Sequence, residues 1–372
     1  MRYGLDARLL AYQGGGIATY IRGLAHALCA AELGSGEMLT LLQSRRDPQA
    51  FAPCPQCEVR GLWTPPHHIW EEWGLGLELA LLPLDLIHSP DFIPPFRRRC
   101  PAVITVHDLD FLRSPETKTA DSLRYYGQIR RAVADAEGII SVSQTTARDL
   151  MELVGVEPSR VHVVYHGVGE SFRPLNDAVA VGDFCRRRGL PAEFVLWVGT
   201  MEPRKNLQCL FQAVAGVMDR LPRSKAHLVL AGPRGWGTDQ IDAAFEQSGL
   251  ADRTTFFGPA SEDELVWLYN AAWVFAFPST YEGFGLPPLE AMACGAPVVA
   301  SNAPALPEVL GDAALFFDPH DPEELGAILL RVAEDGELVS RLATSGINQA
   351  ARFQWADTAV RTLDVYRSVV NQ

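Results

Sequence analysis

Long apolar runs are missing from this chain, and so is a recognisable leader. No stretch reaches the ~18 consecutive apolar residues of a membrane-spanning helix. The nearest candidate, residues 75–87, is interrupted by Glu78, Pro83 and Asp85. The N-terminus turns rich in glycine too soon for the apolar part of a secretory signal. We therefore expect a soluble protein, with the cytoplasm as its default location.

An excess of positive charge is also missing. Lys and Arg number 32 against 45 Asp and Glu, which gives a formal net charge of −13 and a pI near 5.2. A chain with this balance has no overall field that would attract nucleic acid or an anionic membrane surface. We expect no nucleic-acid partner and at most peripheral membrane contact. A local basic pocket for a small anion stays open.

Cysteine is sparse. The chain has 7 cysteines, an odd and scattered set, which argues against a disulfide framework. Cys54 and Cys57 form one CxxC motif, but no second pair of cysteine or histidine stands at zinc spacing, and a zinc site needs four ligands. We expect plain thiols on a loop. The acidic residues do not cluster as a metal cage either, so no metal site is expected.

Several catalytic signatures are absent as well. The sequence contains no HExxH, no Walker A lysine loop and no GxSxG. It also lacks GxGxxG, which weighs against a dinucleotide-dependent oxidoreductase. Candidate functional residues must therefore come from other patterns.

The chain does have a regular alternation of strand-like and helix-like segments. Hydrophobic residues make up 48%, which is enough for two cores. Short β-branched or aromatic runs, such as residues 102–110 and 193–199, separate amphipathic segments. This pattern predicts an α/β fold with mainly parallel sheets. Strand signals stop over residues 172–194, and we place a domain break there. The two domains should face each other with the carboxyl ends of their strands, where ligands bind.

The most informative stretch is Ser279–Ser301. A strand should end at about Phe277, and Pro287 or Pro288 suits the first position of a following helix. The amides of residues 283–289 would then lie at the positive end of a helix dipole. Such a position is a ready site for phosphate.

Two carboxylates, Glu282 and Glu290, flank that anion site. Carboxylates accept hydrogen bonds from vicinal hydroxyls, as in ribose recognition. An anion site between two such groups suits a nucleotide sugar. The alternative is that Glu290 only complements the helix dipole and that Glu282 is a solvated loop residue.

A pair of cations, Arg204 and Lys205, follows the predicted strand at residues 193–199. The expected N-cap of the next helix is Asn206. Arg can hold a phosphate through two parallel N–H bonds, and Lys adds a point charge. A solvated basic pair on a turn is the alternative. Because this pair and the anion site both follow strands of one domain, phosphate binding is the stronger interpretation.

The first half of the chain offers two further candidates. Gly14, Gly15 and Gly16 follow the first predicted strand, and they suit either close backbone approach to a ligand or a structural turn. His107 and Asp108 end another strand. His107 is placed to bond a substrate hydroxyl or to take part in proton transfer, unless it is a structural histidine.

These motifs match a known family. The segments GGGIATYIRGLAHAL, VHDLDF and VGTMEPRKNL precede the E-x7-E of Glu282 and Glu290 in the family's order. The chain resembles the retaining glycosyltransferases of family 4, with mannosyltransferase-like members nearest. The resemblance implies the GT-B fold, with two facing Rossmann-like domains, parallel sheets and an interdomain cleft.

The family's organisation implies two domains with different partners. Residues 1–175 would form an N-terminal acceptor-binding domain, and residues 190–354 a C-terminal domain that binds the nucleotide sugar. The last helix, about residues 355–372, would cross back onto the first domain. Acceptor-reading loops of the first half include Trp63 and Trp70, which could stack on sugar rings or only anchor their loop.

On the donor side, the resemblance implies that Glu282 holds hexose hydroxyls and that Glu290 binds the ribose. Arg204 and Lys205 would hold the diphosphate and stabilise it as it leaves. The backbone of the loop between the two acids would assist at Gly283, Phe284, Gly285 and Leu286.

Further roles implied by the resemblance involve three other segments. The nucleobase would lie against residues 256–260, around Gly258. Gly15 and Gly16 would lie near the donor phosphates or the acceptor. His107 would contact the transferring sugar.

The implied function is transfer of a hexose from a nucleotide-diphosphate sugar to a glycan or carrier-lipid-linked acceptor, with retention of configuration. GDP-mannose is the first donor expected and a UDP-hexose the second. Two cations and a helix terminus supply the positive charge that the leaving diphosphate needs, so we expect no required metal or cofactor. The alternatives are a GT-B-type epimerase or phosphorylase, and a non-catalytic sugar-nucleotide-binding protein.

Overall fold

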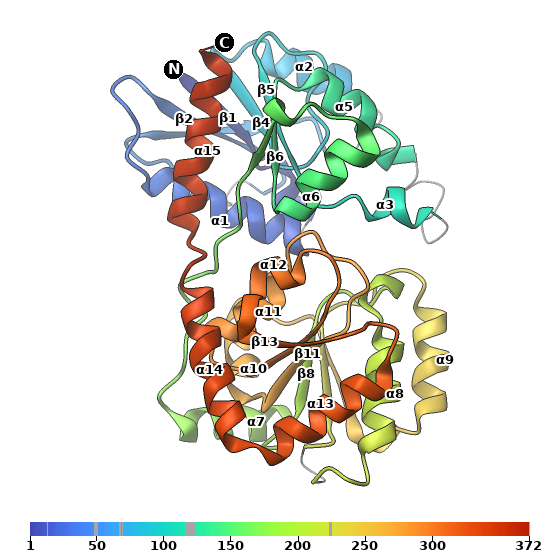
Figure 1. The fold of residues 1–372 in the computed structure, drawn as a ribbon. Coiled ribbons are helices and arrows are strands. Elements are labelled where there is room, and N and C mark those ends of the chain that lie inside the picture. Colours follow the sequence, from blue (N-terminus) through green and yellow to red (C-terminus); the bar gives the residue numbers. More distant parts are fainter. Residues whose placement is uncertain are drawn as a thin grey trace. The chain divides into compact units, whose positions relative to one another are not determined.

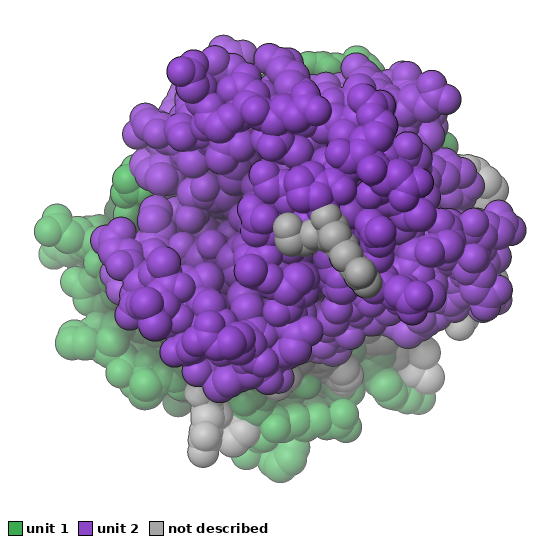
Figure 2. Space-filling model, turned by 90° about the horizontal axis from the view of Figure 1, so that it is seen from below, with its two compact units in different colours: residues 1–167, 354–372 green, residues 168–353 purple. Residues whose placement is uncertain are grey.

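In the computed structural model, the strands form two parallel sheets, each within its own structural unit. Figure 2 shows the two units in different colours. Unit 1 comprises Met1–Gly167 and Gln354–Gln372, and unit 2 comprises Val168–Phe353. The α/β class with parallel sheets that the sequence predicts is confirmed. The structure describes the chain except for residues 13, 48–50, 67, 69, 116–123, 223–224 and 372.

Unit 1 is built on a 7-stranded sheet in the order β3-β2-β1-β4-β5-β6-β7. Every pairing in this sheet is parallel. Strands such as β5 are buried along their whole length, as expected when helices cover both faces of a parallel sheet. The strands are β1 Arg2–Asp6, β2 Met38–Ser44, β3 Cys57–Leu62, β4 Leu86–Ser89, β5 Ala102–Val106, β6 Gly138–Ser141 and β7 Val161–Val163.

The helices of unit 1 include the last helix of the chain. Figure 1 shows α15 beside α1, and the two pack together. Within the described residues, no helix has the length and apolar content needed to cross a bilayer. The helices are α1 Gly16–Ala30, α2 Glu71–Leu79, α3 Asp110–Arg113, α5 Ile129–Asp135, α6 Gln144–Asp149 and α15 Trp355–Val370.

Helix α15 is held to unit 1 by close packing. The ring of Trp355 lies against Gly23 of α1, where an added Cβ would meet the ring at 2.2 Å. Farther along the helix, Leu363 and Tyr366 are buried. The glycine therefore provides the space in which the two helices approach each other.

Unit 2 has a 6-stranded sheet in the order β10-β9-β8-β11-β12-β13, again with parallel pairings throughout. In β8, Val195, Leu196 and Trp197 are fully buried. The strands are β8 Val195–Val198, β9 Leu228–Ala231, β10 Thr254–Gly258, β11 Val274–Phe277, β12 Val298–Ser301 and β13 Ala314–Phe317.

Among the described residues, unit 2 has eight α-helices besides its sheet. The first of them, α7, lies within residues 172–194, where the sequence places a break between domains, and residues from Val168 onward already belong to unit 2. The helices are α7 Ala178–Arg188, α8 Leu207–Val217, α9 Thr238–Ser248, α10 Glu262–Ala271, α11 Leu286–Ala293, α12 Leu306–Leu310, α13 Pro322–Glu334 and α14 Gly336–Ala350.

Each sheet contains a point at which the strand order reverses. In unit 1 this point lies between β1 and β4, and in unit 2 it lies between β8 and β11. The loops at the carboxyl ends of such neighbouring strands diverge to opposite faces of the sheet. They leave the crevice in which open α/β sheets bind ligands.

Candidate functional site

The reversal point of unit 2 carries the cations and the first of the two acids. Arg204 and Lys205 lie on a short 3-10 turn after β8, and Glu282 lies in the loop after β11. The amide of Thr280 donates to the carbonyl oxygen of Arg204 at 2.9 Å, which ties the two loops together. The structure thus brings these three predicted residues to one place.

A partly buried network of ion pairs joins them. Lys205 Nζ lies 2.7 Å from Glu282 Oε1, and Arg204 Nη1 lies 3.1 Å from Glu282 Oε2. Arg204 also pairs with Glu202 at 2.8 Å and donates to the carbonyl oxygen of Tyr281 at 2.8 Å. Each cation therefore has a carboxylate partner. The sequence interpretation expected Arg204 and Lys205 to hold a phosphate, and it missed the ion pair between Arg204 and Glu202.

Glu282 is a permanent anion in this setting. Burial pushes the pKa of its carboxyl upward, but the charges of Lys205 and Arg204 more than offset that effect and lower it to about 2. The side chain is 9% exposed. A carboxylate held in this way accepts hydrogen bonds over the whole physiological pH range and does not act as a proton donor.

Glu290 is in the opposite situation. It lies on α11, is 8% exposed, and accepts a hydrogen bond of 2.9 Å from the hydroxyl of Tyr269. Burial raises the pKa of Glu290 to about 7; the Tyr269 hydrogen bond opposes this shift, and the charge of Glu262 adds to it. The group therefore changes charge near neutrality.

The start of α11 differs in detail from the prediction. The helix begins at Leu286, so Pro287 and Pro288 both fall within its first turn and not at its first position. Since proline has no N–H, the amide donors of this turn are fewer than residues 283–289 suggest. Gly285 has φ +97°, and an added Cβ would meet Leu306 at 2.6 Å, so this position needs glycine for both conformation and space.

Asn206 stands at the N-cap position of α8, as the sequence predicts, but its side chain does not cap the helix. Its backbone has φ 53°, and its side chain makes no cap hydrogen bond. Instead Nδ2 donates to the carbonyl oxygens of Pro278 and Pro319 at 3.0 and 2.8 Å. The Asn206 side chain therefore ties the loop after β8 to Pro278, which follows β11, and to Pro319, which follows β13.

Residues 256–260 lie at the edge of the same sheet. Gly258 ends β10, and its carbonyl oxygen accepts from the amide of Gly232 at 2.7 Å. Strand β9 lies between β10 and β8. Phe256 is 43% exposed on this edge strand. The predicted nucleobase segment is therefore displaced across the sheet from Arg204.

In unit 1, His107 follows β5 as the sequence predicts. Its Nε2 lies 2.9 Å from the carbonyl oxygen of Pro90. A carbonyl oxygen only accepts, so Nε2 carries the proton and Nδ1 keeps the lone pair in the neutral ring. The His107 ring stacks on that of His166 with centroids 5.5 Å apart. Burial lowers the pKa of His107, and the Pro90 bond opposes this.

Beneath His107 lies a buried hydrogen-bond chain that the sequence did not reveal. His88 bonds Tyr366 of α15 at 2.6 Å through Nδ1 and Thr105 of β5 at 2.8 Å through Nε2. Thr105 in turn bonds the hydroxyl of Tyr20 at 3.0 Å. Burial, followed by the charge of His107, lowers the pKa of His88 to about 3. The chain therefore works with a neutral imidazole.

The glycines after β1 lie at the start of α1. Gly15 has φ +84° and precedes the first helical residue, Gly16. Both are exposed, and an added Cβ would meet nothing within 4 Å. Protein packing therefore does not require these glycines; the backbone conformation requires one at Gly15, and the surrounding space is open to a ligand.

Comparison with known proteins places the chain in a family. Residues 14–172 match the family described as Glycosyltransferase Family 4, and residues 187–349 match Glycosyl transferases group 1. O-antigen chain mannosyltransferase B of Escherichia coli is 32% identical over 283 residues, which cover 76% of this chain and 74% of the relative. The chain belongs to glycosyltransferase family 4. The resemblance read from the motifs is confirmed, and the protein is a transferase enzyme.

Two further similarities extend over nearly the whole glycosyltransferase. D-inositol 3-phosphate glycosyltransferase of Thermomonospora curvata is 30% identical over 390 residues, which cover 95% of this chain and 90% of the relative. The crystal structure of Anabaena HepE in complex with UDP and glucose has a TM-score of 0.77 at 21% identity and covers 99% of this chain and 100% of that one. The GT-B fold expected for this glycosyltransferase is confirmed.

The glycosyltransferase also has a buried ion pair at the reversal point of unit 1, which the sequence interpretation missed. Arg8, 1% exposed, pairs with Asp6 at 2.6 Å and with Glu71 at 2.7 Å. Asp6 ends β1. An acid and a base two residues apart at a predicted strand end were the available signal, but nothing in the sequence pointed to Glu71.

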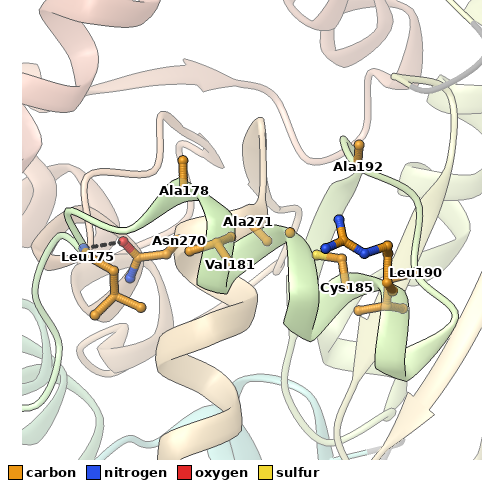
Figure 3. A pocket seen from close by; sticks show the side chains of 10 residues that line it. Leu175, Ala178, Val181, Cys185, Leu190, Ala192, Asn270 and Ala271 are labelled. Carbon is orange, nitrogen blue, oxygen red and sulfur yellow. Dashed lines mark hydrogen bonds between the residues drawn. The ribbon is translucent and has the colours of Figure 1, made fainter.

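A separate cavity lies beside α7 and α10 of unit 2 (Figure 3). Its volume is about 390 Å³ and its lining is largely apolar. Leu175 donates its amide to Asn270 Oδ1 at 2.7 Å in its wall. Arg186 and Cys185 are the titratable residues among those that line it. They do not form an acid–base pair, so we assign this cavity no role in glycosyl transfer.

Proposed function

We propose that this enzyme transfers a hexose, with mannose favoured, from a nucleotide-diphosphate sugar to a glycan or carrier-lipid-linked acceptor, with retention of anomeric configuration. GDP-mannose is the favoured donor and a UDP-hexose the second. The similarity to a protein described as an O-antigen chain mannosyltransferase supports mannose. The similarity in fold to a protein crystallised with UDP and glucose supports a nucleotide sugar.

The observation that carries this proposal is the ion-paired group of half-buried Arg204 with buried Lys205 and Glu282 at the reversal point of unit 2. Breaking the anomeric bond develops negative charge on the diphosphate. Two cations already held in place by Glu282 and Glu202 meet that charge without reorganising, and preorganised donors of this kind are worth several kcal/mol of the barrier.

The two acids have separate tasks in this proposal. Glu282 accepts hydrogen bonds from hydroxyls of the hexose, and backbone amides between Gly283 and Leu286 donate to hexose oxygens. The ionised carboxylate of Glu290 accepts hydrogen bonds from hydroxyls of the ribose, and the hydroxyl of Tyr269 orients this carboxylate. Because Glu290 has a pKa of about 7, donor binding favours its deprotonated state.

A front-side route best accounts for retention of the anomeric configuration in this proposal. Glu282 is stabilised as an anion by two cations, which makes it a poor covalent nucleophile. We therefore propose that an oxygen of the departing phosphate takes the proton of the acceptor hydroxyl, while the acceptor oxygen bonds the anomeric carbon on the face that the phosphate leaves. Arg204 and Lys205 hold that phosphate, and no divalent metal is required.

Unit 1 would supply the acceptor side. We propose that His107 contacts the transferring sugar through Nδ1 and that Gly15 and Gly16 lie near the phosphates or the acceptor. Trp63 and Trp70 are 73% and 65% exposed. Such exposed aromatic rings suit stacking on an acceptor sugar or peripheral contact with the membrane that carries a lipid-linked acceptor.

The test is a transfer assay with paired variants. With GDP-mannose, UDP-glucose and a panel of glycan and lipid-linked acceptors, release of the nucleotide diphosphate should require an acceptor and proceed equally without added Mg²⁺ or Mn²⁺. The double variant Arg204→Ala/Lys205→Ala should lose about 10²–10³-fold in kcat while keeping its fold. Arg341→Ala, an exposed arginine on α14, is the control and should match the wild type.

Three outcomes would contradict parts of the proposal. Wild-type rates in the double variant would remove the cations from the mechanism. Isomerised or phosphorolysed donor in the absence of acceptor would favour an epimerase or a phosphorylase. Inversion at the anomeric carbon, read by NMR of the product linkage, would exclude the front-side route.

A further inference from the structure

We propose that Cys29, Cys54 and Cys57 form a binding site for one zinc ion in unit 1. The three sulfur atoms all lie within 4.8 Å of one another. The proposed function gives none of these residues a role. Within the described part of the chain, no other group of three cysteine, histidine or acidic side chains comes together in this way.

The backbone presents two of the thiols from one turn. Cys54 and Cys57 exchange two hydrogen bonds, each 3.0 Å long between amide nitrogen and carbonyl oxygen. The pair forms an antiparallel bridge at the start of β3. A tight CxxC turn of this kind is the usual way in which a protein offers two thiolates to one zinc ion.

The third thiol comes from a different element. Cys29 is the last residue but one of α1, and its carbonyl oxygen lies 3.8 Å from Cys54 Sγ. The sequence interpretation found no partner for the CxxC because it looked for a second pair of ligands nearby. The fold instead brings a single cysteine from 25 residues earlier in the chain.

The spacing of the sulfurs suits a metal. Four tetrahedral bonds of about 2.3 Å place zinc-bound sulfurs about 3.8 Å apart. Small side-chain rotations would bring three atoms from within 4.8 Å to that spacing. A disulfide between Cys54 and Cys57 would use two of the sulfurs and leave the approach of Cys29 unexplained.

The surroundings suit an ion that keeps one position for solvent. Cys57 is 2% exposed and belongs to the buried core of unit 1, while Cys29 and Cys54 are partly exposed and pack against that core. The partial exposure gives the ion an entry path and leaves room for water as the fourth ligand.

Zinc at this site would cross-link two elements of unit 1. Among the strands that the structure describes, β3 lies at the edge of its sheet and pairs with β2. Three zinc–sulfur bonds would join this edge strand to the C-terminal turn of α1, the helix whose N-terminus follows Gly15. Since the unfolded chain cannot preform the site, zinc should stabilise unit 1 by mass action.

The experiment uses the full chain, purified anaerobically with a phosphine reductant, and Zn²⁺ or Co²⁺ as the only probe. The wild type should bind about one zinc per chain, measured by elemental analysis after gel filtration, and its melting temperature should rise with zinc. Co²⁺ should give an intense thiolate-to-metal charge-transfer band. Cys29→Ser and Cys54→Ser should lose at least tenfold in zinc affinity and most of that band.

Cys100→Ser is the matched control. Cys100 is another partly exposed thiol of unit 1, and it lies outside the group. This variant should bind zinc as the wild type does. Transfer activity of Cys54→Ser should also persist, so the zinc site and the proposed function fail separately.

Several results would overturn the zinc site. They are absence of zinc binding by the fully reduced wild type, equal zinc affinity in Cys54→Ser and Cys100→Ser, or a Cys54–Cys57 disulfide as the sole form recovered with zinc present. Because Cys29 and Cys54 are partly exposed, their serine variants should fold even if Cys57→Ser does not. The cobalt spectrum of the wild type tests the site without any variant.

Discussion

At the scale of single residues, two buried carboxylates of unit 2 have opposite charge behaviour because their partners differ. Lys205 and Arg204 hold Glu282 ionised, whereas Glu290 has a neutral hydroxyl partner in Tyr269. Burial raises the pKa of both groups, and only the cations reverse its effect. Substituting each acid should therefore change different properties of the protein.

Glu282→Gln should destabilise unit 2. The substitution leaves Lys205 buried without its carboxylate partner, and breaking a buried pair in this way costs about 3 kcal/mol. The free energy of unfolding at neutral pH, from urea titration, measures the effect. The exposed Glu323→Gln of α13 serves as the control and should change stability by less than about 0.5 kcal/mol.

The acid dependence of stability provides a second readout of the same variant. Glu282 has a folded pKa of about 2 against an ordinary value of 4.5, so its stabilisation is full above pH 4.5 and is lost as the pH falls towards 2. Glu282→Gln should lose less stability over that window than the wild type does. Equal acid losses in the two proteins would show that the ion pairs do not stabilise the fold.

Glu290 should make donor binding depend on pH near neutrality. If only the ionised carboxylate accepts the ribose hydroxyls, the Kd for the donor should be about tenfold weaker at pH 6 than at pH 8, because about a tenth of the sites are ionised at the lower pH. Isothermal titration with the donor nucleotide measures this. Glu290→Gln should bind weakly with a flat profile.

Other charged groups near Glu290 call for a control. Tyr269 stays protonated because burial, followed by Glu290, raises its pKa well above the ordinary value, and burial raises the pKa of Cys294 to about 12. Glu262 on α10 is the acid that remains. Glu262→Gln should keep the pH profile of donor binding. If this variant loses that profile, the titrating group is Glu262 and not Glu290.

The titration of Glu290 should affect folding stability in the opposite direction to donor binding. The folded pKa of Glu290, about 7, lies above the ordinary 4.5, so the folded state binds more protons between these values. Stability contributed by this group is therefore full below pH 4.5 and is lost as the pH rises through 7. Donor binding and folding stability should thus change in opposite directions over the same window.

At the scale of elements, α15 is docked on unit 1 by a polar chain within an apolar contact. Tyr366 bonds His88 of β4, and His88 bonds Thr105 of β5. Both His88 and Thr105 are fully buried. A chain of this kind fixes the position of the helix on the sheet, since a shift along the helix would leave buried polar groups unpaired.

Tyr366→Phe should therefore destabilise unit 1 by about 1–3 kcal/mol, because it leaves His88 Nδ1 buried without its partner. Urea unfolding measures the loss. Ser368→Ala on the same helix is the control: its hydroxyl donates to the carbonyl oxygen of Val365 within the helix, and its removal should cost less. A neutral Tyr366→Phe would show that apolar packing alone docks α15.

At the scale of the whole molecule, the two units differ in how the chain builds them. Unit 2 is continuous, from Val168 to Phe353, whereas unit 1 needs the C-terminal segment from Gln354 onward. Apart from Gly15, Gly16 and His107, which belong to unit 1, all residues to which we assign a role in donor binding lie in the continuous unit. A fragment of residues 168–353 therefore contains a complete sheet and the proposed nucleotide site.

This fragment should fold alone and bind nucleotide. We expect its melting temperature to rise with GDP or UDP, since a ligand that binds only the folded state stabilises it by RT ln(1 + [L]/Kd). The fragment with Arg204→Ala and Lys205→Ala should fold but show little shift. Residues 1–167 without α15 should be poorly folded, because Gly23 and His88 would lose their packing partners.

Much of the fold was predictable because parallel α/β sheets produce strong local patterns. Short buried runs such as Val195–Val198 end in glycine-rich loops, and that pattern predicted both the class and the strand ends that carry Arg204 and Glu282. The motif order predicted the family. Which residues contact the donor and the acceptor stays a prediction.

The charge state of the site was not predictable, because pKa values depend on burial and on partners distant in sequence. Glu202, Tyr269 and Asn206 affect the site through contacts that no local pattern encodes. The same holds for Cys29, which the fold brings from α1 to within 4.8 Å of the CxxC sulfur atoms.

The sequence by itself determined the alternation of elements, the family and the positions of the candidate side chains after strand ends, since these follow from periodicity and from residues adjacent in the chain. Only the tertiary structure decided that two cations hold Glu282 ionised, that the pKa of Glu290 lies near neutral pH, and that three cysteines converge. Those outcomes depend on distances in space between residues far apart in the chain, and hydrophobic burial of the sheets sets these distances.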